Sequence, residues 1–241
     1  RLNTDGQLDN SFQNNTVLAD PSTVYDVALQ TDDKVIVGAS FGPYSVTVRR
    51  FNSDATPDTG FAPIFSITGR VNKVLPLSDG KTLIGGEFPF FNGVKRNGLV
   101  RLNSNGTLDT GFVPYLNSDA SQRSIIAIAT QPDGKVLIGI AGVDQVIRLN
   151  ADGTKDASFT TPFFGPANDI IVLTNGQILA GGSFGLRRLN SNGSNDGTFV
   201  AQPNGAVNKI VIQANGRIMI GGAFTQVGAV IRGRIARLNE T

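Results

Sequence analysis

The stretch RLNSNGTLDTGF, residues 101–112, decides the fold, because close variants of it recur along the whole chain. The other copies begin at Arg1, Arg50, Arg148 and Arg188, and a shortened copy, RLNET, begins at Arg237. Successive copies begin about 47 residues apart on average, a period that is typical of the blades of a β-propeller.

Each repeat also contains a hairpin motif, such as IATQPDGKVLIG at residues 128–139. Two apolar runs flank a pair of turn-forming residues, and Asp-Gly or Asn-Gly pairs are typical of two-residue type I′ turns. The pairs are Asp32-Asp33, Asp79-Gly80, Asp133-Gly134, Asn175-Gly176 and Asn215-Gly216. The RLN motif adds a second hairpin, so the sequence predicts four strands per repeat. In the first full repeat they span residues 24–30, 34–37, 46–52 and 56–61.

The repeats predict a single all-β domain over residues 1–241, a five-bladed β-propeller of four-stranded antiparallel blades. The repeat units lie near residues 13–61, 62–112, 113–159, 160–199 and 200–241, preceded by residues 1–12. The last unit lacks a fourth strand, whereas residues 7–12 form a surplus one. We expect this N-terminal strand to close the ring, which removes the exposed sheet edge of the last blade. The alternative is a five-repeat part of a larger array.

The composition argues against several classes of function. The chain has a net charge of +2 and 17% charged residues, too few for the dense cationic surface of a nucleic-acid-binding protein. It has no His and no Cys, which removes zinc sites, disulfides and thiol or imidazole nucleophiles. The sequence therefore predicts no cofactor and no metal site, and its apolar runs are too short for a membrane span. Because the chain begins with Arg1, we expect a mature or excised part of a larger protein.

Two motifs carry a resemblance to a known family. RLNADGTKDASF at residues 148–159 and IATQPDGKVLIG at residues 128–139 are similar to the bacterial delta-60 repeat. GGEFPFFNGVKRNGLVRLN at residues 85–103 resembles the longer form of that repeat. The resemblance covers essentially the whole chain, because both motifs recur in order. It implies a β-propeller in a large secreted or surface protein of bacteria, and it implies no catalytic residues.

An Arg and an Asp recur eight residues apart in the RLN motifs. On a hairpin these two positions face each other across the strands. We interpret them as ion pairs that hold each blade together, rather than as a ring of anion-binding sites, because a feature repeated in every blade is typical of scaffold. The pairs are Arg1/Asp9, Arg50/Asp58, Arg101/Asp109, Arg148/Asp156 and Arg188/Asp196, and the predicted core Phe residues that follow them are Phe12, Phe61, Phe112, Phe159 and Phe199.

Neither a calcium loop nor an enzyme active site is predicted. The run NADGTKD, residues 150–156, has oxygen-bearing residues at spacings that calcium loops use, but Asn105 and Asn192 replace the Asp in two other repeats, so we interpret it as a turn. No S-x-x-K, G-x-S-x-G or P-loop motif occurs. A glycosidase would need two convergent carboxylates, for which Glu87 with Asp119 or Asp144 is the available choice. The sequence predicts a protein that is not an enzyme.

The candidate binding site lies on the irregular connections of the second repeat. Its longest loop spans residues 87–98 and holds Glu87, Phe90, Phe91, Lys95 and Arg96, and the connection that follows holds Tyr115 and Arg123. In a propeller both connections emerge on one face, and function in repeat folds tends to lie on variable loops. Aromatic rings beside cationic donors suit a sugar or a protein surface. Packing of Phe90 and Phe91 between blades is an equal alternative.

The sequence therefore predicts an extracellular, non-enzymatic recognition or adhesion module of a bacterial surface protein. We expect its partner to be a glycan or a protein on a cell surface, and not a nucleic acid. One alternative is a structural spacer or assembly propeller without a ligand of its own. Another is a hydrolase or lyase that uses carboxylates.

Overall fold

The computed structural model describes residues 1–12, 22–41, 45–61, 69–118, 123–162 and 164–239. Their regular structure is almost entirely β, as the composition predicts, with one short 3-10 helix, η1 (Tyr115–Ser118). The chain divides into two compact units, Arg1–Ser124 and Ile125–Thr241.

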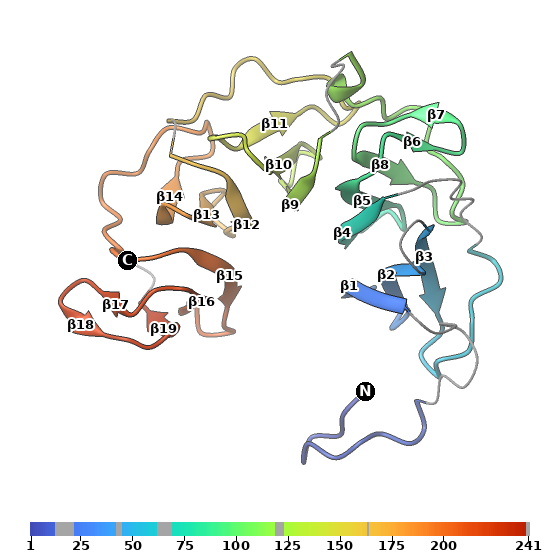
Figure 1. Cartoon of the computed structure of the whole chain (residues 1–241), viewed down its shortest axis with the longest axis horizontal. Helices are drawn as coiled ribbons and strands as arrows, with labels where there is room; N and C mark the ends of the chain where they lie inside the picture. Colours follow the sequence, from blue (N-terminus) through green and yellow to red (C-terminus); the bar gives the residue numbers. More distant parts are fainter. Residues whose placement is uncertain (13–21, 42–44, 62–68, 119–122, 163, 240–241) are drawn as a thin grey trace. The chain divides into compact units, whose positions relative to one another are not determined.

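Three-stranded antiparallel sheets are the main elements of both units (Figure 1). The first unit holds β1 (Ser22–Leu29), β2 (Val35–Phe41) and β3 (Ser45–Phe51), followed by β4 (Arg70–Pro76), β5 (Thr82–Glu87) and β8 (Leu99–Leu102). The second unit holds β9 (Ile125–Thr130), β10 (Val136–Ile140) and β11 (Ile147–Leu149), then β12 (Ala167–Val172), β13 (Ile178–Gly182) and β14 (Gly185–Leu189), then β15 (Val207–Ile212), β16 (Ile218–Gly222) and β19 (Ile235–Leu238). Two small hairpins, β6 (Phe90–Phe91) with β7 (Val94–Lys95) and β17 (Gln226–Val227) with β18 (Val230–Ile231), precede β8 and β19.

The predicted fourth strand of each repeat is reduced to one residue pair. In the second repeat, Leu102 and Leu108 form an isolated bridge, after which Phe112 N donates a hydrogen bond to Asp109 O at 3.2 Å. This turn ends the ladder, so the prediction of four-stranded sheets is corrected to three strands and a tight turn. The equivalent bridges are Phe51–Pro57, Leu149–Lys155 and Leu189–Asn195.

The expected closing strand, residues 7–12, pairs within its own segment. Leu8 bridges Leu2, and Asp9 N donates to Arg1 O at 2.9 Å. The three-stranded sheets of the described residues do not include this segment, and closure of the ring by it stays a prediction.

The hairpin turns also differ from the predicted type. Gly80 has φ +80°, whereas Asp79 keeps a negative φ, and Leu77 N donates to Lys81 O at 2.8 Å. This is a three-residue loop whose last residue is left-handed, not a two-residue type I′ turn. The Asp79 side chain accepts a hydrogen bond from Lys81 N at 3.0 Å, a bond that an Asn side chain makes equally well. The alternation of Asp and Asn among the repeats therefore follows from turn formation.

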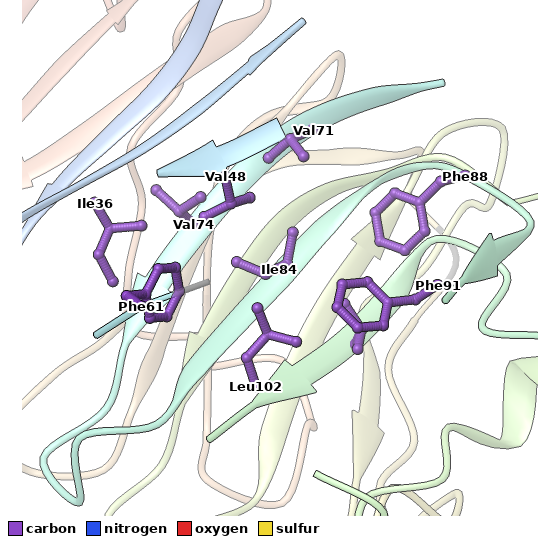
Figure 2. Packing of buried hydrophobic residues seen from close by; sticks show 10 residues of the cluster. Ile36, Val48, Phe61, Val71, Val74, Ile84, Phe88, Phe91 and Leu102 are labelled. Atoms are coloured by element: carbon purple, nitrogen blue, oxygen red, sulfur yellow. The ribbon is translucent and has the colours of Figure 1, made fainter. Parts of the chain in front are cut away.

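The hydrophobic core of each unit lies between neighbouring sheets. Figure 2 shows Ile36, Val48 and Phe61 of the first repeat packed with Val71 and Ile84 of the second. In the second unit, β9–β11 packs with β12–β14 in the same manner, and β12–β14 packs with β15, β16 and β19. The core is thus formed by residues that neighbouring repeats share, as expected for a propeller.

Two further contacts fix adjacent sheets within a unit. Gly38 of β2 leaves room for Val71 of β4, because a Cβ on Gly38 would lie 2.5 Å from Val71 Cγ1. Asp26 Oδ2 of β1 accepts a hydrogen bond from Val74 N at 2.9 Å. The second unit repeats both contacts, with Gly181 against Val207 and Asp169 Oδ2 accepting from Ile210 N at 2.8 Å.

Candidate functional site

The long loop of the second repeat is a hairpin. Phe91 pairs with Val94 and Phe90 with Lys95, across the turn residues Asn92 and Gly93. Both turn residues have positive φ, +47° and +73°, as a two-residue type I′ turn requires. The side chains of this loop therefore project from a regular two-stranded hairpin.

The two adjacent Phe residues of this hairpin have opposite environments. Phe91 is 1% exposed and belongs to the core shared with Ile84 and Val100, whereas Phe90 is 47% exposed. Figure 2 shows the Phe91 ring beside Phe88 and Ile84. The assignment of Phe91 to a binding surface is therefore corrected, because successive residues of a strand point to opposite sides. Phe90 and Lys95 are exposed and directly opposite each other.

Arg96 is buried, contrary to the prediction of an accessible cationic donor. Its side chain is 5% exposed; Nη1 donates to Lys95 O at 2.9 Å, and Nε has no hydrogen-bond partner among the described residues. Burial away from water lowers the pKa of Arg96. The adjacent Asn97 is buried too, and its Nδ2 donates to Leu116 O of η1 at 2.6 Å.

The loop and the connection that follows the repeat lie together. Glu87, at the end of β5, forms an isolated bridge with Ser124, and a Cβ on Gly98 would lie 2.6 Å from Arg123 O. Tyr115 and Arg123 are half-buried, whereas Glu87 is exposed. The structure therefore brings the remaining predicted site residues to one side of the second repeat, with Phe90, Lys95 and Glu87 as its exposed side chains.

The recurring Arg and Asp form ion pairs, each capped by an aromatic ring. Arg148 Nε donates to Asp156 Oδ2 at 2.9 Å, and the Arg148 guanidinium lies 4.4 Å from the centre of the Phe159 ring. Its Nη1 also donates to Ser191 O, in the turn of the next repeat, at 2.6 Å. Arg50 makes the same three contacts, with Asp58, Phe61 and Ser104 O.

A Lys or Gln also reaches four of these five carboxylates, all except Asp9, and the sequence analysis missed these contacts. Lys81 Nζ lies 2.9 Å from Asp109 Oδ2, and Gln177 Nε2 donates to Asp196 Oδ2 at 2.8 Å. The signal was a Lys or Gln directly after the turn of the first hairpin, as in Asp79-Gly80-Lys81. Burial alone raises the pKa of Asp109, but hydrogen bonds from Lys81 and Arg101 outweigh this effect and lower it.

The fifth repeat carries a second hairpin of the same construction. Phe224 is fully buried like Phe88, and Arg232 N donates to Thr225 O as Arg96 N does to Pro89 O. Ile231 faces Gln226 at the positions that Lys95 and Phe90 occupy in the second repeat. The two hairpins thus have the same strand pairing and the same backbone hydrogen bond, but they expose different side chains.

The fold and the repeated ion pairs define a β-propeller protein. A family model described as "Domain of unknown function (DUF5122) beta-propeller" matches residues 30–61, 77–112, 131–159, 173–199 and 213–241, together more than half of the chain. The chain belongs to this family. No curated protein sequence matches it.

Solved structures similar to the chain include the WD40 β-propeller domain of Doa1 (TM-score 0.59, 13% identity, 83% of this chain and 62% of that one). A gluconolactonase from Xanthomonas campestris has a TM-score of 0.56 at 13% identity, with 83% of this chain and 69% of that one covered. A streptogramin B lyase has a TM-score of 0.54 at 16% identity, with 92% and 70% covered. The chain spans 57% of the length of another match, the computationally designed Ika8 protein.

Two of these neighbours contradict the expectation that the chain is not an enzyme. The gluconolactonase and the lyase are enzymes with this fold, so the lack of familiar catalytic motifs does not exclude catalysis here. At these identities the likeness concerns the fold alone. Asp119, one carboxylate considered for an active site, lies outside the described residues.

Two further features are absent from the described ranges. No group of three or more acidic side chains gathers there in a way that could hold a metal ion. No helix there is long and apolar enough to cross a membrane.

Proposed function

We propose that the five repeats are the blades of one β-propeller domain over residues 1–241, and that this domain is a recognition module of an extracellular bacterial surface protein. Its ligand is a glycan or a protein segment. The ligand binds to the second-repeat surface, which we define as Glu87, Phe90, Lys95, Tyr115 and Arg123.

The observation that carries this proposal is the exposed pair of Phe90 and Lys95. The two residues lie opposite each other on the hairpin, so an aromatic ring and a cation stand side by side. A sugar ring stacks on an aromatic face, while its hydroxyls accept hydrogen bonds from an ammonium group. The exposed carboxylate of Glu87 adds an acceptor.

The hairpin is held in place before any ligand arrives. Phe91 anchors it in the core, and both Arg96 N and Asn97 N donate to Pro89 O, at 2.8 and 3.1 Å. The bond from Asn97 to Leu116 ties it to η1. A surface held in this way loses little conformational entropy on binding.

The proposed extracellular setting rests on the resemblance of the repeats to the delta-60 repeat of secreted and surface proteins. The mean hydropathy of −0.01 and the absence of Cys are compatible with that setting.

A glycan array with the isolated chain tests the proposal. We expect Phe90→Ala and Lys95→Ala to weaken binding of the captured glycan about tenfold or more, with a melting temperature within a degree or two of the parent, as is usual for surface substitutions. Ile231→Ala, at the matching position of the fifth-repeat hairpin, is the control and should bind as the parent does. Because propeller enzymes share this fold, the captured glycans are also followed for turnover.

Unchanged binding in both second-repeat variants would place the ligand elsewhere on the molecule. A chain that binds neither glycans on the array nor proteins of a target cell surface would favour a structural spacer.

A further inference from the structure

The chain contains seven Asn-Gly pairs, and one of them differs from the others in its hydrogen bonds. The pairs begin at Asn92, Asn97, Asn105, Asn175, Asn192, Asn204 and Asn215. Asn is a chemically labile residue, and an Asn that precedes Gly is the most exposed to attack, because a Gly N without a neighbouring Cβ can approach the Asn Cγ closely. The attack requires the Asn side chain and the Gly N to move toward each other, which hydrogen bonds on either group oppose.

Four of the pairs lie in the regular hairpin turns, where both groups are held. In the RLN turn of the second repeat, Gly106 N donates to Asn103 O at 2.9 Å, and Asn105 Oδ1 accepts from Thr107 N at 3.1 Å. The pairs that begin at Asn175, Asn192 and Asn215 make the same two hydrogen bonds. A rotation toward attack would break both bonds in each of these turns.

Two further pairs are held by other contacts. Asn97 is buried, and its Nδ2 donates to Leu116 O at 2.6 Å. Asn204 Oδ1 accepts hydrogen bonds from Thr225 N and Gln226 N, at 2.9 and 3.0 Å. In both pairs the Asn side chain is therefore fixed away from the Gly N that follows it.

The remaining pair, Asn92-Gly93, forms the tip of the β6–β7 hairpin. Neither the Asn92 side chain nor Gly93 N has a hydrogen bond within the described part of the chain, because the pairing of Phe91 with Val94 closes this turn. Both residues are exposed, and a Cβ on Gly93 would have no atom within 4 Å. The peptide between them can therefore rotate out of its turn conformation without losing a hydrogen bond of its own.

We propose that Asn92 is a site of spontaneous deamidation, the one pair of the seven that reacts while the protein is folded. Gly93 N loses its proton and forms a bond to Asn92 Cγ, and the side-chain amide leaves as ammonia. Water then opens the resulting five-membered succinimide ring at one of its two carbonyls, which gives aspartate or isoaspartate. Water is the only co-reactant, and no electrons are transferred.

The reaction changes the exposed surface of the hairpin. Either product adds a negative charge three residues from Lys95, and isoaspartate also adds a methylene group to the backbone of a two-residue turn. Phe90 and Lys95 lie opposite each other only while this turn keeps its register. We therefore expect the converted hairpin to bind the ligand of the second-repeat surface more weakly. This consequence rests on the proposed function, whereas the conversion itself does not.

Incubation of the folded chain at mildly alkaline pH, followed by peptide mass spectrometry, tests the proposal. Replacement of an amide by a carboxyl group raises the mass of the peptide, and chromatography separates isoaspartate from aspartate. We expect conversion at Asn92 to be about tenfold or more faster than at each of the other six pairs, ~1.4 kcal/mol in the barrier. In urea, where the turns are lost, we expect all seven pairs to react at comparable rates.

Asn92→Gln is the matched variant, because attack by Gly93 N on the longer side chain would have to form a six-membered ring, which forms far more slowly. On ion-exchange chromatography the parent should accumulate acidic species during the incubation, whereas Asn92→Gln should stay uniform. Binding of both incubated proteins to the captured glycan is measured beside fresh samples. The parent should lose binding as Asn92 is converted, and the variant should not.

Two results would overturn the proposed modification. The first is conversion at Asn105 or Asn192 as fast as at Asn92 in the folded chain. The second is an unreacted Asn92 under conditions in which the chain unfolded in urea reacts. Unchanged glycan binding after complete conversion at Asn92 would refute the consequence for the second-repeat surface alone, and circular dichroism spectra of the incubated proteins separate a loss of binding from a loss of fold.

Discussion

Arg101 and Asp109 are joined by a hydrogen bond of 2.6 Å between Nε and Oδ2, and both side chains are at least 85% buried. The Arg101 guanidinium lies 4.6 Å from the centre of the Phe112 ring, and Asp109 also binds Lys81. One carboxylate thus links the first hairpin of the repeat, through Lys81, to the last strand, through Arg101.

Asp109→Ala should lower the free energy of unfolding by about 1–3 kcal/mol, because Arg101 then keeps a buried charge without its carboxylate. Chemical denaturation followed by circular dichroism measures this. Asp144→Ala, at an exposed loop position, is the control and should change stability by less than about 0.5 kcal/mol. If the Asp109 variant is as stable as the parent but has lost ligand binding, the ion pairs belong to a binding site and not to the scaffold.

Arg96→Met should leave the protein as stable as the parent, or more stable by up to about 2 kcal/mol. The substitution removes a buried guanidinium whose Nε lacks a partner among the described residues, and it keeps most of the side-chain volume. Arg101→Met is the matched comparison and should be destabilising, because Arg101 is paired with Asp109. Equal losses of stability in the two variants would show that Arg96 is satisfied in solution.

Gly86→Ala should be destabilising by about 1–3 kcal/mol or should prevent folding, as overpacking does. A Cβ at Gly86 would lie 2.0 Å from Arg70 O, so the backbones of β4 and β5 would have to separate. Gly197→Ala provides the control, since no atom lies within 4 Å of the Cβ it would add. Thermal unfolding compares the two, and a Gly86 variant that melts with the parent would contradict the close approach of these strands.

Acid should destabilise the protein through the same carboxylates. A hydrogen bond from Lys34 is the largest effect lowering the pKa of Asp58, and the hydroxyl of Ser158 has that role for Asp156. Folded-state pKa values below the unfolded value of about 3.9 mean that the unfolded chain binds more protons. This stabilisation is complete above that pH and is lost as the pH falls toward the folded values. Unfolding followed from about pH 6 to about pH 2.5 should show the loss, with a shallower dependence in Asp109→Asn; a pH-independent stability would refute it.

The recurring sequence motifs predicted the β class, the propeller fold and the ion pairs, because each of these depends on a pattern that repeats within the chain. Arg101 and Asp109 face each other in the structure at the spacing that the sequence shows. The alternation of strand residues was also enough to predict that Phe90 and Phe91 cannot both be exposed. The burial of Phe91 was therefore open to prediction from the sequence, whereas the sequence analysis left packing and binding as equal alternatives for both residues.

Other features depend on contacts between distant segments. Arg96 and Arg232 stand at the same position of two similar hairpins, yet Arg96 is buried and Arg232 is exposed. The difference accompanies the bond from Asn97 to Leu116, 19 residues further along the chain, which no local pattern encodes. The turn type was also predicted wrongly. A type I′ turn needs positive φ at both Asp79 and Gly80, but only Gly80 is left-handed, and the Asp79 side chain instead accepts a hydrogen bond from Lys81 N.

The hydrogen bonds from Arg50 to Ser104 O and from Arg148 to Ser191 O end on backbone carbonyls, not on side chains. A backbone carbonyl is present whichever amino acid occupies the position, so a substitution in the neighbouring turn does not remove this hydrogen bond between repeats. Any repeat that carries the arginine can therefore make this bond to the repeat that follows it, whatever residue occupies the turn. Duplication of a whole repeat by recombination would preserve this bond, although the side chains that pack between neighbouring repeats would still have to fit one another.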